Sequence, residues 1–534
     1  MAARANPPAV PWLKLHGVLL WLALLPLTLC FIVFVVYAAN LIQFPFDYDQ
    51  GEGFELVDTL LFSQGRWPYR DIEVYPFYAS NYPPLFHLLA VPFAWIFGPS
   101  HAYGRLLGTL ATLVAAAAIA FAVRRAGGRI LVAALSGLAF IASNTVYHIG
   151  PLNRQHMSMV MFETLAIVTL AGVDELSSPR RRRKRLILGL GLILAAGYTK
   201  QLALMTAAAA LAYLFIRQPR RGLLAAAALA LCGGGLFALL TLATDGHWWL
   251  HVISANVNRY DPQQALALFA QWFGLHGFLI VPALLLVIYE LYVERLSIYS
   301  LWFVAALVPG LLAGKWGAGD SYFSTAIAAT CILAGIGVSR LQAQLSNSKV
   351  PVAGLVLVLI PLLYAGYGRA VLHLPTGTPP FDTLAGLLDI RPNALNNLYD
   401  SARSAGGDFP PGYADIGHLT SAADVAAGNA ILARVRAVDG PVLSEDAAFS
   451  LLAGKDVVTN PTQLLNLANN GLFQGDALVA MIREQEFGLI ILRAAFFPGE
   501  VLEAIAAAYE VDERIGMNGF EYLLYRPRVA APAP

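Results

Sequence analysis

Residues 17–39 read GVLLWLALLPLTLCFIVFVVYAA, and an acidic stretch, FPFDYDQGEGFELVDTLLFSQGRWPYRD, follows at residues 44–71. The apolar run is longer than a signal-peptide core of roughly 7–15 residues, and no small-residue cleavage motif precedes the polar turn at Asn40. Crossing a bilayer takes about 17–25 residues. The sequence therefore predicts a retained first membrane span that opens into a loop rich in carboxylates.

The composition of the whole chain is that of a membrane protein. Of its 534 residues, 57% are apolar and 13% are charged, whereas soluble domains average about 45–50% and about 25%. The net charge of +1 provides no basic surface and argues against a nucleic-acid binder. Cys30, Cys232 and Cys331 lie far apart inside apolar runs, which predicts small core residues rather than a disulfide framework or a metal site.

Ten further apolar runs predict additional spans. They occupy residues 105–123, 130–149, 157–173, 186–199, 202–216, 222–243, 268–292, 297–313, 322–339 and 350–367. Another run, residues 84–98, is short for a span and typical of a re-entrant or interfacial segment. The predicted fold class is an α-helical polytopic membrane protein with about 11 spans.

The basic residues between the runs indicate the topology. If residues 84–98 do not cross, 17 Lys and Arg before residue 369 fall on one side of the membrane and 7 on the other. The largest cluster is residues 180–185, which are all basic. Positive residues prefer the cytoplasmic side. The N-terminus is therefore predicted to be cytoplasmic, with the chain after the last span outside.

The chain divides into two predicted domains, a membrane module at residues 1–368 and an extracytoplasmic α/β domain at residues 369–534. The second part holds 19 of the 34 acidic residues, and strand-like and helix-like stretches alternate in it. The strand-like stretches are residues 441–443, 456–459, 487–492 and 520–525, and the helix-like stretches are residues 421–435, 462–469, 477–484 and 501–508.

The first outer loop, residues 40–84, carries most of the unusual chemistry. It contains seven acidic residues: Asp47, Asp49, Glu52, Glu55, Asp58, Asp71 and Glu73. Apolar residues at helical spacing between residues 51 and 65 predict a short amphipathic helix on the membrane surface. Carboxylates at the start of that helix are favoured by its dipole, and crowding raises the pKa of some of them. The competing interpretation is a solvated acidic loop.

Four isolated cations fall at the same predicted boundary: Arg154, Lys200, Arg259 and Lys315. Buried charges among apolar helices cost free energy unless they are paired, which marks them as candidate functional residues. Together the four cations predict a phosphate-binding site. Each cation alone could instead be a side chain that extends its charged end to the membrane–water interface. Glu163 lies inside a span and predicts either an ion pair or a hydrogen bond between helices.

Metal binding is left open by the sequence. The spacing of the histidines does not match a zinc motif. A divalent cation held by Asp47, Asp49 or Glu52 together with water and a substrate phosphate is chemically reasonable, although the spacing does not demand it.

The order of these features resembles the GT-C superfamily of integral-membrane glycosyltransferases, which includes protein O-mannosyltransferases and lipid A aminoarabinose transferases. The resemblance rests on the acidic first loop, Gly65-Arg-Trp-Pro-Tyr69, Tyr82-Pro-Pro-Leu85 and the basic-ended span that follows. It covers roughly residues 17–340 and is strongest at residues 47–105. The order of the loops carries the resemblance more than any single motif.

The resemblance implies transfer of a hexose or pentose from a polyprenyl-phosphate donor to a hydroxyl of a lipid, glycan or protein, on the outer side of the membrane. Asp49 best matches the catalytic aspartate of the family, which acts as general base, and Asp47 is next. Because Gln50 stands where the family often has glutamate, Glu52 remains a third candidate. The cations would stabilise the departing phosphate.

The resemblance also implies a groove that is open to lipid and accepts the polyprenyl tail. Trp67, Tyr69 and Tyr82 are suited to line it, unless they form an ordinary interfacial aromatic belt. The C-terminal domain either binds the acceptor or caps the outer cavity. The Ala- and Arg-rich composition indicates a bacterial inner membrane.

Two other functions compete with a glycosyltransferase. A transporter or flippase of a lipid-linked sugar also needs buried charges, but transporters often contain repeated halves, which this sequence does not show. An O-antigen polymerase or ligase uses similar donors but places its catalytic loop late in the chain. The early acidic loop favours the glycosyltransferase.

Overall fold

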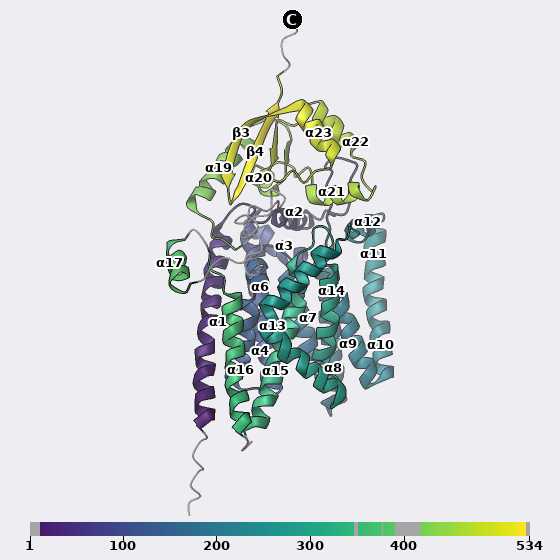
Figure 1. Cartoon of the computed structure of the whole chain (residues 1–534). Coiled ribbons are helices and arrows are strands. Elements are labelled where there is room, and N and C mark those ends of the chain that lie inside the picture. Colours follow the sequence, from purple (N-terminus) through teal and green to yellow (C-terminus); the bar gives the residue numbers. More distant parts are fainter. Residues whose placement is uncertain (1–10, 347–350, 376–377, 390–416, 530–534) are drawn as a thin grey trace, which may run out of the picture.

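The computed structural model describes residues 11–346, 351–375, 378–389 and 417–529. Figure 1 shows a bundle of long helices with a small sheet-containing domain stacked on one end of it. Arg4 and Lys349, which the charge count assigned to the cytoplasmic side, lie outside the described residues. The fold class predicted from the sequence, a helical membrane bundle with a C-terminal sheet region, is confirmed.

The bundle is built from the predicted apolar runs, each of which is helical along most of its length. Its helices are α1 (Pro11–Gln43), α4 (His101–Arg125), α5 (Ile130–Ala142), α6 (Asn144–Ile149), α7 (His156–Leu170), α8 (Pro179–Thr199), α9 (Leu204–Arg217), α10 (Pro219–Leu229), α11 (Gly235–Ala243), α13 (Pro262–Tyr292), α14 (Ile298–Leu311), α15 (Ser324–Ser346) and α16 (Pro351–Val371). Within the described residues, seven helical stretches are long and apolar enough to cross a membrane. The count of eleven spans and their orientation stay predictions.

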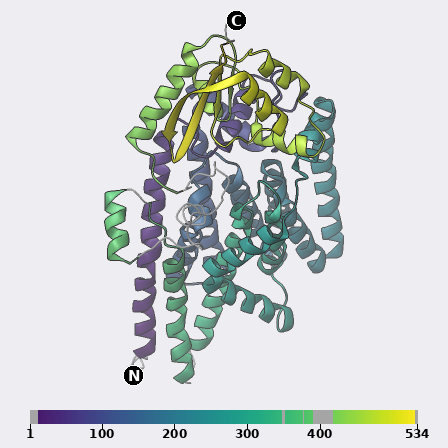
Figure 2. The same cartoon turned by 45° about the horizontal axis from the view of Figure 1, so that its top comes forward.

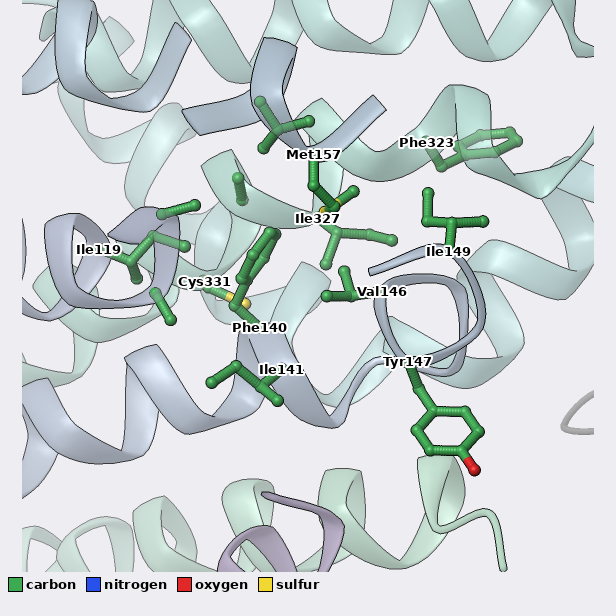
Figure 3. Close-up of a cluster of buried hydrophobic side chains, with 14 of the residues drawn as sticks. Ile119, Phe140, Ile141, Val146, Tyr147, Ile149, Met157, Phe323, Ile327 and Cys331 are labelled. Atoms are coloured by element: carbon green, nitrogen blue, oxygen red, sulfur yellow. The ribbon is translucent and has the colours of Figure 1, made fainter. Parts of the chain in front are cut away.

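The centre of the bundle is closely packed with apolar side chains. Figure 3 shows one such cluster, in which Ile119, Phe140, Met157 and Ile327 come together from four different helices. Cys331 belongs to this cluster, and Cys30 is also buried, as the sequence predicted. Cys232 is exposed instead, because it lies in a π-helical turn between α10 and α11 at the edge of the bundle.

Glu163 is the acidic residue that the sequence placed inside a span. It lies on α7, where its two carboxylate oxygens accept hydrogen bonds from Thr206 of α9 and Thr325 of α15, each at 2.6 Å. Of the two alternatives left open by the sequence, the structure shows the hydrogen bonds between helices.

The C-terminal domain is a four-stranded sheet covered by helices. Its strands β1 (Val442–Ser444), β2 (Leu489–Leu492), β3 (Tyr509–Met517) and β4 (Phe520–Pro527) are ordered β1-β2-β4-β3, with β1 and β2 parallel and the other pairs antiparallel. The helices are α19 (Ala422–Ala437), α20 (Ala447–Leu452), α21 (Pro461–Asn469), α22 (Asp476–Arg483) and α23 (Gly499–Ala508). The domain boundary predicted after residue 368 stays a prediction.

One predicted strand is wrong and one observed strand was missed. Residues 456–459 are not a strand, because Val457 and Val458 pack against the first outer loop instead of joining the sheet. Strand β3 was missed because its central residues are largely charged and exposed, which hides the alternation expected of a half-buried strand.

The first outer loop lies between the bundle and the C-terminal domain. Its helix α2 (Gly51–Ser63) was expected on the membrane surface, yet nine of its residues are buried. Phe54 and Val57 of α2 pack against Ala447 and Val457 of the C-terminal domain. The helix is thus covered from above by that domain, while α3 (Leu85–Phe97) packs against it from below (Figures 1 and 2).

Helix α3 corresponds to the short apolar run at residues 84–98. Its 13 residues rise about 20 Å at 1.5 Å each, which is shorter than the roughly 30 Å of a bilayer core. Its length therefore agrees with a segment that does not cross.

A buried ion pair between α2 and α4 fixes the loop in place. The Arg105 guanidinium donates to both carboxylate oxygens of Glu52, at 2.9 and 2.7 Å, and neither side chain is exposed. The remaining donors of Arg105 reach the backbone carbonyls of Leu41, Phe44 and Phe46. Although burial alone would raise the pKa of Glu52, Arg105 lowers it to about 2. One guanidinium thus ties the end of α1 to the start of α2.

Breaking this pair should destabilise the whole outer layer. Arg105→Gln leaves the Glu52 carboxylate buried without its cation, a change that typically costs about 3–5 kcal/mol. We expect a clearly lower Tm for the detergent-purified variant. The double variant Arg105→Gln/Glu52→Gln carries no buried charge and should recover more than half of the loss. A single variant as stable as the wild type would contradict the role given to this pair.

Candidate active site

A polar cavity lies where the first outer loop, the outer ends of the bundle helices and the C-terminal domain meet. About 1060 Å³ within it is free of atoms, open solvent included. Its lining residues are Asp49, Gln50, Gly51, Phe54, Glu55, Asn81, Tyr82, Arg154, Asn256, Asn258, Lys315, Trp316, Gly317, Tyr322, Asn460, Thr462, Gln463, Asn466, Arg493, Phe496 and Phe520.

Two carboxylates and one guanidinium form the charged floor of the cavity. The Arg154 guanidinium donates from Nε to Oδ2 of Asp49 at 2.7 Å, and its Nη2 forms an ion pair with the same oxygen at 2.5 Å. Its Nη1 lies 3.5 Å from Oε1 of Glu55. No described residue donates to Oδ1 of Asp49, so this oxygen is left for a ligand in the cavity. The ion pair fixes the Asp49 carboxylate in one orientation.

Gly51 allows this arrangement because a side chain there has no room. A Cβ at Gly51 would overlap the Arg154 guanidinium, and one at Gly53 would overlap the Asp47 carboxylate. The Gly-Glu-Gly sequence at the start of α2 therefore lets a cation and a carboxylate approach the helix from opposite directions.

A second row of buried acids stands behind Asp49. Burial raises the pKa of Glu55 to about 8, against the opposing effect of Arg154, and raises that of Asp58 to about 7. The imidazole Nε2 of His87 lies 3.4 Å from Glu55 and 3.7 Å from Asp58. Asp58 also accepts a hydrogen bond of 2.5 Å from Ser80. Glu55 thus faces the cavity in front while it contacts a hydrogen-bonded acid and histidine cluster behind.

Two lysines stand near two tyrosines on another wall. Lys200 places its ammonium 5.1 Å from the ring centre of Tyr82 and 5.5 Å from that of Tyr322, and both rings line the cavity. Lys315 lines the cavity itself, and burial lowers its pKa. Within the described residues, neither lysine forms a salt bridge with a carboxylate. Lys200 is buried, does not line the cavity itself, and contacts Nε2 of His156, so the charge on this wall that is open to an anionic ligand is that of Lys315.

Arg259 does not line the cavity, unlike the predicted cations Arg154 and Lys315. Its side chain is exposed and does not line the cavity, and only its backbone carbonyl contributes there, by accepting a hydrogen bond from Trp316. The reason is that Tyr260 pairs with Lys315, and this bridge turns the preceding side chain outward. We therefore leave Arg259 out of the site.

Two of the three predicted catalytic carboxylates also lie away from the cavity. Glu52 is fully buried against Arg105, as described above. Asp47 is 1% exposed, with Oδ2 accepting a hydrogen bond from the backbone of Ala448 and Oδ1 lying 3.6 Å from His101. Both therefore hold the loop together, and Asp49 alone of the three lines the cavity.

The three aromatic residues predicted for a groove take different places. Tyr82 lines the cavity. Tyr69 is buried behind it, donates a hydrogen bond of 2.7 Å to the Tyr82 carbonyl, and packs on Trp248. Trp67 is 43% exposed and contacts Phe62 at the outer edge of α2. Only Tyr82 can touch a ligand, while Tyr69 positions it.

Several lining residues were missed by sequence reasoning. Glu55 was counted in the acidic loop but not in the site, although it lies on α2 three residues after the candidate Glu52. The C-terminal domain contributes Asn460, Asn466 and Arg493. These residues follow Asp49 by more than 400 positions and match no motif, so no local signal marked them.

The acidic trio considered for a divalent cation does not fit one. Each carboxylate already has another partner: Asp49 has Arg154, Glu52 has Arg105, and Asp47 has a backbone amide. Within the part of the chain that the structure describes, no group of three or more His, Cys, Asp or Glu is arranged to hold a metal ion.

Comparison with known proteins identifies the fold. The family model described as dolichyl-phosphate-mannose-protein mannosyltransferase matches residues 81–248. The structure of ArnT from Cupriavidus metallidurans in the apo state aligns over 95% of this chain and 97% of that one, at 14% identity and a TM-score of 0.58. The chain has the GT-C fold.

Two other structures are similar to this GT-C chain. The same ArnT bound to undecaprenyl phosphate aligns over 95% of this chain and 98% of that one, at 14% identity and a TM-score of 0.57. The oligosaccharyltransferase of Archaeoglobus fulgidus aligns over 92% and 73%, at 12% identity and a TM-score of 0.49. No curated protein sequence matches the chain. The fold implied by the resemblance to the GT-C superfamily is confirmed.

The raised pKa of Glu55 predicts how the stability of the site depends on pH. The folded protein binds this proton more tightly than the unfolded chain, so the stabilisation is complete below the ordinary carboxylate pKa of about 4 and is lost as the pH rises through about 8. Glu55→Gln should flatten the fall in Tm between about pH 5 and pH 8. Asp71→Asn, at an exposed position of the same loop, should not change it. If Tm falls with pH as steeply in Glu55→Gln as in the wild type, the raised pKa of Glu55 is contradicted.

Proposed function

We propose that the chain transfers a sugar from a polyprenyl-phosphate donor to an acceptor hydroxyl on the outer face of the membrane. The observation that carries the proposal is the presence, in one cavity, of an oriented carboxylate, that of Asp49, and a lysine without a carboxylate partner among the described residues, Lys315. The structure of ArnT that contains undecaprenyl phosphate has the same fold, which supports this class of donor. The acceptor is a lipid, a glycan or a protein.

Asp49 is the proposed general base. The acceptor oxygen attacks the anomeric carbon of the sugar, and its proton passes to Oδ1 of Asp49 while Arg154 holds Oδ2. The bond between the anomeric carbon and the phosphate oxygen breaks, and the electron pair leaves with the polyprenyl phosphate. Glu55 shares Arg154 and helps to hold it beside Asp49.

Lys315 is the proposed phosphate-binding residue, and Lys200 is buried behind Tyr82 and Tyr322 on the same wall. The phosphate gains negative charge as the sugar leaves, and fixed positive charges in a site shielded from water stabilise that charge. Tyr82 and Tyr322 stand close to the Lys200 ammonium and would flank the phosphate. Arg154 contributes less to the phosphate because the Asp49 carboxylate is already paired with it.

The proposal is tested by donor consumption. Purified protein is incubated with undecaprenyl-phosphate sugars that carry a labelled sugar, and release of the label is measured. Asp49→Asn should reduce turnover by roughly 10²–10⁴-fold, the usual contribution of a general base, without changing the Tm. Lys315→Ala should chiefly raise the KM for the donor. Asp71→Asn serves as the matched control and should behave as wild type.

Two results would count against this function. Equal turnover in Asp49→Asn and wild type would remove the base assignment. Wild-type protein that consumes no donor but moves labelled lipid across liposome membranes would make the chain a transporter of lipid-linked sugars instead.

A further inference from the structure

The roof of the cavity is lined by side-chain amides. They come from the first outer loop, from the segment before α13 and from α21 of the C-terminal domain, and they are Gln50, Asn81, Asn256, Asn258, Asn460, Gln463 and Asn466. An amide carries both a donor and an acceptor, so it can bind hydroxyl groups in either sense. We call this set the amide wall.

Two members of the amide wall hold it in place. Asn460 donates to the Ala79 carbonyl at 3.1 Å and caps the start of α21. Gln463 donates to the Ala255 carbonyl at 3.4 Å. These bonds attach α21 to the loops of the membrane module, so the two walls of the cavity keep a fixed separation.

Other polar atoms at the cavity are buried without a partner. They are Nε2 of Gln50, Oδ1 of Asn258 and Nε of Arg493. Asn466 is 7% exposed, and its side chain makes no hydrogen bond within the described protein. A buried polar atom without a partner costs about 1–3 kcal/mol. Donors and acceptors left unpaired in a ligand pocket are the atoms that a bound ligand satisfies.

Aromatic rings complete the surroundings of the amide wall. Trp316 and Phe496 meet edge to face with ring centres 6.3 Å apart, one from the membrane module and one from the C-terminal domain. Tyr82, Tyr322 and Phe520 also line the cavity. Apolar rings next to hydrogen-bonding amides suit a molecule that carries both C–H faces and hydroxyl groups, as a sugar does.

The charges around the amide wall argue against a cationic ligand. Of the described residues that line the cavity, the carboxylates are Asp49 and Glu55, and Arg154 engages both. The cationic groups that line the cavity are those of Arg154, Lys315 and Arg493, so among the described lining residues they outnumber the carboxylates. A sugar ammonium placed there would be desolvated without a counter-charge, at a cost of several kcal/mol.

We propose that the amide wall binds the transferred sugar and that this sugar is neutral, with hydroxyl or acylated groups but no free amino group. This inference rests on the proposed function and narrows its donor class. Asn466, Asn258 and Gln50 are then specificity-determining residues, because they contact the sugar rather than the phosphate.

The test compares matched donors. Undecaprenyl-phosphate mannose, glucose and galactose are each compared with their 2-amino and 4-amino derivatives in the hydrolysis assay. Wild-type protein should use at least one neutral donor with a kcat/KM roughly tenfold or more above that of its amino derivatives, since a polar site rejects a group that it cannot pair. Asn466→Ala should lower kcat/KM for the neutral donor while leaving the Tm unchanged.

A variant that gains use of a new donor tests the inference independently of folding, because a misfolded protein only loses activity. Asn466→Asp keeps the shape of the side chain but adds a carboxylate to the wall, so it should raise the use of an amino donor relative to its neutral parent by roughly tenfold. Asn469→Asp introduces the same charge at an exposed position of the same helix, outside the cavity, and should leave the ratio unchanged.

The outcomes separate this inference from the function on which it rests. If wild-type protein prefers an amino donor, or if Asn466→Asp and Asn469→Asp behave alike, the neutral-sugar inference is wrong although the chain is a glycosyltransferase. If no donor in the panel is consumed, the proposed function fails and the inference fails with it.

Discussion

The buried pair of Arg105 and Glu52 is the constraint on which the outer half of the molecule depends. A carboxylate and a guanidinium without solvent exposure are tolerated only when nearly all their hydrogen-bonding atoms are satisfied, and here three backbone carbonyls and three backbone amides complete the set. The pair joins α4 to the start of α2. The orientation of α2 then decides which acids face the cavity and which are buried for structure.

The orientation of α2 determines which acidic residues stabilise the structure and which face the cavity. Glu52 and Asp47 point into the protein and hold it together, while Asp49 and Glu55 flank Arg154 at the cavity. The C-terminal domain rests on α2 and closes the cavity with its own side chains. The site is therefore shared between the two parts of the chain: both contribute amides and cationic groups, and the first outer loop contributes the carboxylates.

The fold and part of the candidate site were predictable from the sequence. The predictions that were wrong share one cause, which is that they depended on partners distant in sequence. Hydropathy and charge gave the helical bundle, and the order of the loops gave the GT-C resemblance and Asp49. Glu52 and Asp47 could not be separated from Asp49 because their difference lies in distant partners, Arg105 and Ala448. Arg259 looked equivalent to Lys315 until a backbone bridge turned it outward. Asn466 and Arg493 lie in the C-terminal domain, and no local sequence pattern predicts how that domain packs on the first outer loop.

The most direct test of the account is a structure of the full-length protein with bound undecaprenyl phosphate. The account predicts phosphate density within hydrogen-bonding distance of Lys315, flanked by Tyr82 and Tyr322, with the amide wall above it. Phosphate bound elsewhere, such as at the basic residues 180–185 at the opposite end of the bundle, would contradict it.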